Sequence, residues 1–183
     1  MAEVISYSVK FLNPDKIINE LEIYPGMTIA HFGSSVGYFT FPLAQKVGEC
    51  GSVYALDVSE AKIDAVKSRA KMMNLSNIAV RRVNLEEKEG SKIAGGSVDW
   101  VIIANMLYQN EHKSRIIEEA KRILKKEGRI LLIEWASLDS SIGPEIRSRI
   151  SKEELIKIIR RHKLGISKEI NAGDFHFGLI LVK

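Results

Sequence analysis

The sequence predicts an α/β fold: a doubly wound, Rossmann-like sheet of seven strands, mostly parallel, with an antiparallel C-terminal strand. Short runs of apolar and β-branched residues alternate with amphipathic stretches, which is typical of a parallel sheet covered by helices on both faces. A glycine-containing bend follows the first strand, where sheets of this kind bind ligands. The last two strands are joined only by NAGD, which is too short for a crossover helix and therefore predicts a hairpin.

The first helix is predicted to begin at Asn13, which can cap it, with Pro14 in the first turn. Residues 28–32 (TIAHF) then form a short buried strand. The bend at residues 33–37 leads into a second helix that ends near Val47.

Residues 52–57 (SVYALD) are predicted as the second strand, and Ser59 as the N-cap of the helix after it. Residues 78–83 (IAVRRV) form the third strand. The following segment, 84–97, is polar and rich in glycine, so we expect a loop with at most a short helix before the strand at 98–105.

A helix is predicted from about Glu111 to Lys126, because its last lysines suit the helix dipole and Gly128 can end it. The fifth strand covers residues 129–135. Ser151 and Glu154 then predict a capping box for the last helix. Two strands, about 165–171 and 175–182, complete the sheet.

The length of 183 residues and the 45% of apolar residues suit a single domain over residues 1–183, with residues 1–12 as an extension of uncertain structure. No apolar run approaches the roughly 20 residues that span a bilayer, and the N-terminus lacks the pattern of a secretory signal. We therefore expect a cytoplasmic protein without a membrane span.

The net charge of +4 comes from basic residues that alternate with acidic and apolar ones at helical spacing, which indicates a solvated surface. A small-molecule substrate is therefore expected, and an RNA-facing patch remains the alternative. The single cysteine, Cys50, excludes a disulfide within the chain and disfavours a thiolate metal site. Because the four histidines are scattered, no metal is expected.

The spacing of the first bend distinguishes two classes of cofactor. A dinucleotide fingerprint that begins at Gly33 requires glycine at positions 35 and 38, where this chain has Ser35 and Tyr38. A nicotinamide-dependent oxidoreductase is therefore disfavoured. Gly33 and Gly37 instead match the first and last glycines of the pattern E/D-x-G-x-G-x-G.

Five further segments carry a resemblance that extends over nearly the whole chain from about Phe11. They are GYFTFPLA, VYALDVSEAKI, GGSVDWVIIANMLYQ, EEAKRILKKEGRILLIEW and FHFGLILVK. The chain resembles class I S-adenosylmethionine-dependent methyltransferases, in particular the small ubiquinone/menaquinone-biosynthesis-like enzymes. The resemblance implies the class I methyltransferase fold, S-adenosyl-L-methionine as cofactor and a methyltransferase activity.

The resemblance also assigns roles to individual residues. Asp57 would accept hydrogen bonds from both ribose hydroxyls, which suits a carboxylate with two acceptor oxygens. Val58 would pack on the adenine, Asn84 and Leu85 would contact its edge, and Asn105 would face the methionine end. The other implied cofactor-binding residues lie near the end of the first strand and in the loop that follows it, which we call the first loop: His31, Gly33, Ser34, Ser35, Gly37 and Tyr38.

Three positions depart from the family pattern. His31 stands where an acid is usual and brings no compensating charge, Ser35 replaces the middle glycine, and Asn84 removes another acid. These changes are compatible with an active enzyme of altered cofactor affinity. The alternative is a non-catalytic member of the fold that binds its ligand weakly or not at all.

Methyl transfer from a sulfonium needs alignment of the acceptor and exclusion of water more than an invariant base. Tyr108 is a candidate for orienting a polar acceptor, or it simply packs as a partly buried aromatic residue. Glu134 is a candidate base if burial raises its pKa. Arg147 and Arg149, in the loop 136–150 that has the length of a lid, would hold an anionic substrate or pair with surface acids.

Overall fold

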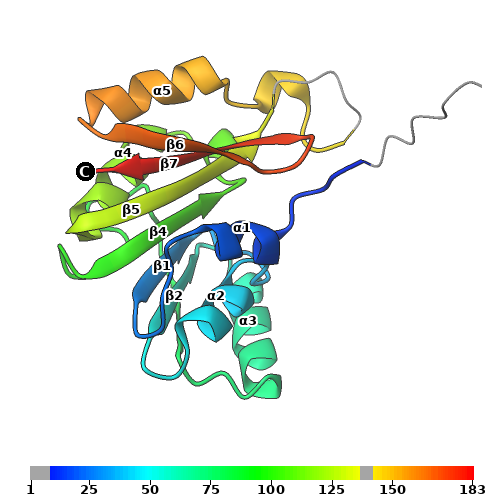
Figure 1. The fold of residues 1–183 in the computed structure, drawn as a ribbon, viewed down its shortest axis with the longest axis vertical. Helices are drawn as coiled ribbons and strands as arrows, with labels where there is room; N and C mark the ends of the chain where they lie inside the picture. The colour runs from blue at the N-terminus through cyan, green and yellow to red at the C-terminus, as the bar shows by residue number, and fades with distance from the viewer. Residues whose placement is uncertain (1–8, 137–141) are drawn as a thin grey trace, which may run out of the picture.

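The computed structural model describes residues 9–136 and 142–183, which form one seven-stranded sheet with helices on both faces (Figure 1). The strands are β1 (Thr28–Phe32), β2 (Ser52–Asp57), β3 (Ile78–Arg82), β4 (Val98–Ala104), β5 (Leu124–Trp135), β6 (Gly165–Asn171) and β7 (His176–Val182). Their order is β3-β2-β1-β4-β5-β7-β6. Strands β1 to β5 pair in parallel, whereas β7 is antiparallel to both β5 and β6, as the short NAGD connection predicts.

The helices divide between the two faces of the sheet. Buried side chains of α1 (Pro14–Glu20), α2 (Thr40–Val47) and α3 (Glu60–Met72) pack on one face. Buried side chains of α4 (Lys113–Ile123) and α5 (Lys152–Arg161) pack on the other. Figure 1 shows the first three helices near β1 and β2, and α5 beside the C-terminal strands. The predicted doubly wound architecture is confirmed.

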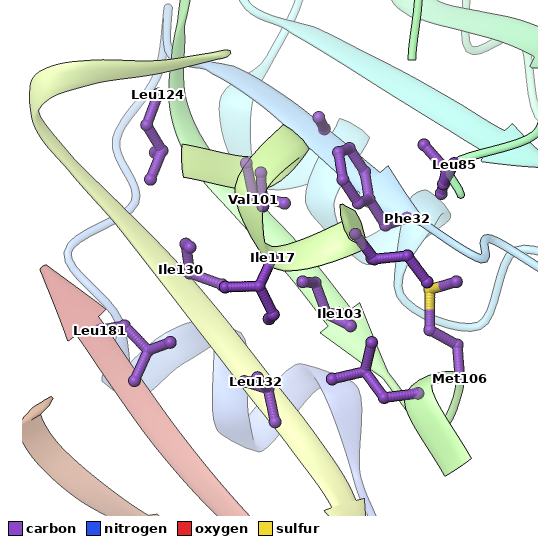
Figure 2. Packing of buried hydrophobic residues seen from close by; sticks show 14 of the residues in the cluster. Phe32, Leu85, Val101, Ile103, Met106, Ile117, Leu124, Ile130, Leu132 and Leu181 are labelled. Atoms are coloured by element: carbon purple, nitrogen blue, oxygen red, sulfur yellow. The ribbon is translucent and has the colours of Figure 1, made fainter. Parts of the chain in front are cut away.

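The core beneath α4 and α5 extends to the carboxyl end of the sheet. Figure 2 shows Phe32, Ile103 and Leu132 from neighbouring strands in this core, together with Leu85 and Met106 from the loops after β3 and β4. Burial of apolar area at roughly 25 cal/mol per Å² makes this layer a main source of stability. The loops that carry Leu85 and Met106 are therefore anchored by the core itself.

Two of the three predicted helix caps form as side-chain caps. Asn13 Oδ1 accepts a hydrogen bond from the Lys16 N–H at 3.0 Å, and Ser151 Oγ accepts one from the Glu154 N–H at 3.1 Å. Ser59 is the N-cap residue of α3 but makes no side-chain cap. The prediction of its position was correct, and the prediction that its hydroxyl caps the helix was wrong.

The predicted end of the fourth long helix was also wrong. Helix α4 ends at Ile123, and β5 begins at Leu124, which pairs with Val98 of β4. Lys125 therefore lies outside the helix, where its Nζ forms an ion pair with Asp99 at 2.8 Å. Gly128 does not end a helix; a Cβ there would lie 2.5 Å from the Leu124 side chain. Strand pairing thus overrides the helical preference of the lysine-rich segment.

Candidate functional site

A cavity of about 640 Å³ lies at the carboxyl ends of β1, β2, β3 and β4. The strand order reverses between β1 and β4, which is where sheets of this class bind ligands. Eleven of the thirteen residues predicted from the sequence to be at the site line this cavity, and Gly37 and Glu134 do not. The predicted residues that line the cavity are His31, Gly33, Ser34, Ser35, Tyr38, Asp57, Val58, Asn84, Leu85, Asn105 and Tyr108.

Asp57 lies at the centre of this arrangement and is only 6% exposed. Its Oδ2 accepts a hydrogen bond from the Ser35 N–H at 2.9 Å, and its Oδ1 accepts one from the Ser59 N–H at 3.0 Å. A carboxylate offers about four acceptor positions, so about two remain for a ligand. Asp57 both shapes the neighbouring loops and presents acceptors at the cavity.

The first loop contains left-handed backbone at three positions. Gly33 has a φ of +66°, Ser35 of +49° and Gly37 of +92°. A Cβ on Gly33 would lie 2.9 Å from Met106 Sδ, so the first loop and the loop after β4 are in close contact. The loop therefore has a left-handed residue at Ser35, where a side chain is least favourable.

Gly37 does not line the cavity, although the sequence predicted that it approaches the ligand. A Cβ on Gly37 would lie 2.3 Å from the Phe41 ring. Its left-handed φ and this contact with α2 both require glycine. Gly37 thus allows α2 to pack, on the side of the loop that faces a different surface pocket.

His31 is buried at the cavity wall and is neutral at pH 7. Its Nδ1 lies 2.8 Å from Thr40 Oγ1 on α2. Burial lowers the pKa of His31 to about 4, although the nearby Asp57 carboxylate acts in the opposite direction. Sequence reasoning did not identify Thr40, because only the tertiary packing of α2 brings it to His31.

The loops after β2 and β3 form the other end of the cavity. Val58 is 64% exposed and lies at the rim, whereas Leu85 is 5% exposed and belongs to the core. The Asn84 side chain is used by its own turn: Oδ1 accepts from the Glu86 N–H at 3.0 Å, and Nδ2 donates to Glu87 Oε1 at 3.2 Å. Asn84 therefore borders the cavity with its amide already engaged.

We call residues 105–110, which follow β4, the acceptor-side loop. Asn105 has a φ of +51°, and its Nδ2 lies 3.0 Å from His176 Nε2 on β7. Burial, with a smaller effect of the Arg149 charge, lowers the pKa of His176 to about 4. Tyr108, Gln109 and Asn110 also line the cavity. Together with Met106, these residues form a mostly polar wall without a charged side chain.

The sequence predicted Glu134 as a candidate base at the site, but Glu134 does not line the cavity. It is fully buried behind the acceptor-side loop, where Oε1 accepts hydrogen bonds from the Met106 N–H at 3.0 Å and the Leu107 N–H at 2.6 Å. Burial raises the pKa of Glu134 from 4.5 to about 7, against the effect of these hydrogen bonds. The expected pKa shift is present, but the carboxylate faces backbone rather than the cavity.

An N-terminal segment, residues 9–12, borders the cavity at Leu12 and was not predicted to do so. Tyr38 Oη donates a hydrogen bond to the Leu12 carbonyl at 2.8 Å, so the phenol is engaged with this segment. Lys10 and Asp174 exchange two hydrogen bonds of 2.8 Å, one of them to the Asp174 carboxylate. The segment thus joins the first loop to the turn between β6 and β7.

The two arginines of the predicted lid do not line the cavity. Arg147 Nε pairs with Glu145 Oε2 at 2.5 Å, which is the surface pairing that was one of the two expectations. Arg149 donates hydrogen bonds to the carbonyls of Ala136, Ile142 and Pro144. Residues 137–141 of the predicted lid lie outside the described residues.

Residues 9–136 and 142–183 contain neither a candidate metal site nor a candidate membrane span. No cluster of three or more His, Cys, Asp or Glu side chains there has a geometry that could bind a metal ion. No helix in this part of the chain combines the length and apolar character needed to cross a membrane.

Curated proteins and a family model match most of the chain. The family model described as "Methyltransferase domain" matches residues 23–168. The chain is 29% identical over 134 residues to demethylmenaquinone methyltransferase from Lactococcus lactis, covering 73% of this chain and 52% of that protein. It is 25% identical over 126 residues to arsenite methyltransferase from Aquipseudomonas alcaligenes, covering 67% of this chain and 36% of that protein. The chain therefore spans about half or less of the length of these relatives.

The crystal structure of a SAM-dependent methyltransferase from Aquifex aeolicus has the same fold. It superposes with a TM-score of 0.86 at 23% sequence identity, covering 93% of this chain and 89% of that chain. The match at residues 23–168 includes β1 to β5 and all the loops that line the cavity after them. The chain belongs to the methyltransferase domain family and has the fold of the class I S-adenosylmethionine-dependent methyltransferases.

Proposed function

We propose that this chain binds S-adenosylmethionine in the cavity and that its methyl group passes to a small, uncharged acceptor. The observation that carries the proposal is the placement of Asp57, a buried carboxylate with about two free acceptor positions beside the first loop. When bound, S-adenosylmethionine supplies an electrophilic methyl group on sulfur. The protein then has to align the acceptor and exclude water.

The lining residues suit the cofactor at both of its ends. Asp57 would accept hydrogen bonds from the ribose hydroxyls, and Leu85 offers apolar surface for the adenine. Ser34 Oγ and Asn105 Oδ1 are buried and have no hydrogen-bond partner among the described residues. Because unpaired buried polar atoms are unfavourable, they support a polar ligand near the methionine end.

His31 would meet the methionine end as a neutral side chain. Burial keeps the pKa of His31 near 4, so the ring carries no charge at pH 7. It can exchange a hydrogen bond with an ammonium group only as an acceptor, and it supplies no opposite charge. We therefore expect weaker binding of the cofactor than an acidic residue at this position would give.

The distribution of charge in the cavity supports an uncharged acceptor. The charged lining residues Asp57, Lys62 and Glu86 belong to β2, α3 and the loop after β3. The acceptor-side loop instead lines the cavity with amides, the phenol of Tyr108 and the thioether of Met106. Tyr108 would orient the acceptor through a hydrogen bond, and no charged group of that loop compensates an ionic acceptor.

The cysteine content favours a carbon acceptor, such as a reduced quinone ring, over arsenite. Trivalent arsenic is a soft centre, and soft centres are bound by thiolates. This chain has one cysteine, Cys50, which is exposed in the turn between α2 and β2 and does not line the cavity. It provides no set of thiolates for an arsenic substrate.

The decisive experiment is calorimetric titration of the chain with S-adenosylhomocysteine and S-adenosylmethionine. Saturable binding of both ligands supports the proposal, and a subsequent assay with radiolabelled S-adenosylmethionine and a soluble naphthoquinol tests the acceptor class. Transfer to arsenite in place of the naphthoquinol would refute the carbon acceptor.

A non-catalytic role is the competing hypothesis, and the left-handed φ of +49° at Ser35 favours it. A loop that forces a side chain into this conformation is strained, and the strain can distort a ligand site. Absence of saturable binding at millimolar S-adenosylhomocysteine would support this hypothesis. Salt-dependent binding of tRNA would instead point to an RNA acceptor.

A further inference from the structure

Three consecutive backbone N–H groups at the start of the acceptor-side loop point at β5. The Asn105 N–H donates to the Ile133 carbonyl at 2.9 Å. The next two N–H groups, of Met106 and Leu107, donate to the same oxygen of Glu134 at 3.0 and 2.6 Å. The Glu134 carboxylate therefore accepts hydrogen bonds from the next two backbone N–H groups after the strand pairing of β4 with β5 ends.

The backbone at this point needs such support. Asn105 has a φ of +51°, and a left-handed conformation is unfavourable for a residue with a side chain. The chain then turns through a short 3₁₀ helix, Leu107–Gln109, that places Tyr108 and Gln109 at the cavity. Glu134 Oε1 accepts from two successive N–H groups, and these hydrogen bonds are strongest when the carboxyl is ionised, so Glu134 can hold this turn.

The acceptor-side loop in turn packs against the first loop. A Cβ on Gly33 would lie only 2.9 Å from Met106 Sδ, so Met106 fills the space that glycine leaves open. Met106 is only 6% exposed and lies in the core that also contains Phe32 and Leu107. A shift of the Met106 backbone would therefore be transmitted to the loop that holds Ser34 and Ser35.

Burial of the Glu134 carboxylate costs free energy of folding. Its side chain is fully buried, and Oε2 has no hydrogen-bond partner among the described residues. A buried carboxylate with one unpaired oxygen destabilises the fold, so its presence indicates a role beyond stability. We infer that Glu134 is a positioning residue, whose carboxylate fixes the acceptor-side loop, and through Met106 the first loop, in the arrangement that binds the cofactor. The inference rests on the proposed function.

The chain offers a matched control in Glu119, on α4. Glu119 is 4% exposed, and its carboxylate accepts hydrogen bonds from the Ser91 N–H at 3.0 Å and from Arg122 Nε at 2.7 Å. It does not line the cavity. The substitution E119Q makes the same change of a buried carboxyl group to an amide, at a position away from the acceptor-side loop.

The test compares wild type with E134L, E134Q and E119Q by titration with S-adenosylhomocysteine. We expect affinity to fall about tenfold or more in E134L and about twofold to threefold in E134Q, because the amide oxygen of glutamine can still accept from both N–H groups. E119Q should retain the wild-type affinity even where its melting temperature falls. Amide hydrogen exchange at Met106 and Leu107 should be faster in E134L than in wild type and intermediate in E134Q.

Equal affinities of wild type and E134L, or an equal loss in E119Q, would overturn the inference. If E134L does not fold, E134Q decides: unchanged affinity together with unchanged amide exchange at residues 106 and 107 rejects the positioning role. Failure of the wild type itself to bind S-adenosylhomocysteine rejects the proposed function instead. In that event amide exchange in E134Q still reports whether Glu134 fixes the loop.

Discussion

The Asp57 carboxylate accepts a hydrogen bond from the Ser35 N–H at 2.9 Å, so the acid after β2 also orders the loop after β1. Its other oxygen accepts the Ser59 N–H at the start of α3. One side chain therefore fixes two loops and still offers acceptor positions at the cavity. Substitutions at Asp57 test both roles.

Replacement of Asp57 by alanine should weaken S-adenosylhomocysteine binding by about 100-fold, because two hydrogen bonds to an ionised group are lost at about 1.5 kcal/mol each. Calorimetric titration measures the change. Asp64, an exposed acid on α3 that pairs with Lys67, provides the control D64A, which should bind like wild type. An equally tight complex with D57A would contradict the proposed ribose contact.

Ser35 should be a position where glycine stabilises the fold. A left-handed φ costs a residue with a side chain roughly 1–2 kcal/mol, and the extra unfolded-state entropy of glycine offsets roughly 0.5–1 kcal/mol of the gain. S35G should therefore raise the free energy of unfolding by about 0.5–1 kcal/mol in urea denaturation. The neighbouring Ser34 has no positive φ, so S34G should destabilise; stabilisation by both substitutions would refute the strain at Ser35.

Alanine substitutions at Gly37 and Gly26 distinguish the cost of backbone strain from the cost of a steric clash. Both have a positive φ, of +92° and +86°, but a Cβ on Gly26 meets nothing within 4 Å, whereas a Cβ on Gly37 meets Phe41. G26A should cost about 1 kcal/mol for strain, and G37A should cost about 1–3 kcal/mol more for overpacking. Because Gly37 lies outside the cavity lining, folded G37A should still bind S-adenosylhomocysteine. Equal stabilities of G26A and G37A would rule out the contact with Phe41.

Glu134 makes stability depend on pH. Its pKa is 4.5 in the unfolded chain and about 7 in the fold, so between these values the folded state holds a proton that the unfolded state releases. Stability is therefore lost as the pH rises from 4.5 to 7, by about 3 kcal/mol at 1.36 kcal/mol per pKa unit. The buried histidines His31 and His176, whose pKa values lie near 4, contribute the opposite slope below pH 6.5.

The measurement that isolates Glu134 is the difference between wild type and E134Q. Free energies of unfolding from urea titrations at pH 5, 6, 7 and 8 should show wild type losing stability relative to E134Q up to about pH 7. The histidines cancel in this difference because both proteins contain them. Parallel pH profiles of the two proteins would show that the Glu134 carboxyl does not titrate in this range.

Most strands could be predicted from the sequence, because short apolar runs between turn residues specify them locally. The bounds of β1 and β2 are correct to the residue. The start of β5 could not be predicted, since Leu124 is drawn into the sheet by pairing with Val98, which is distant in sequence. At the end of α4, local helix preference gave the wrong answer because a long-range strand pairing competed with it.

In the candidate site, too, features set by local sequence could be predicted, and features set by long-range packing could not. The positions of Asp57, which ends β2, and Asn105, which follows β4, could be predicted because they lie at the carboxyl edge of the sheet. Their binding roles follow from the family resemblance and stay predictions. The hydrogen-bond partners of the site residues could not be predicted. Thr40 lies beside His31, and His176 beside Asn105, only because other elements of the fold pack there. The pKa shift of Glu134 could be anticipated from burial, but the direction in which its carboxylate faces depends on the backbone of the acceptor-side loop.

The link between Lys10 and Asp174 has a consequence for the order of events during synthesis. Leu12, two residues after Lys10, lines the cavity, and Asp174 lies in the turn between the final two strands. The N-terminal segment cannot take this position until the last hairpin has left the ribosome and paired with β5. The cavity therefore acquires this boundary only after β6 and β7 have been synthesised and paired, and a nascent chain lacking them has a cavity without the wall at Leu12.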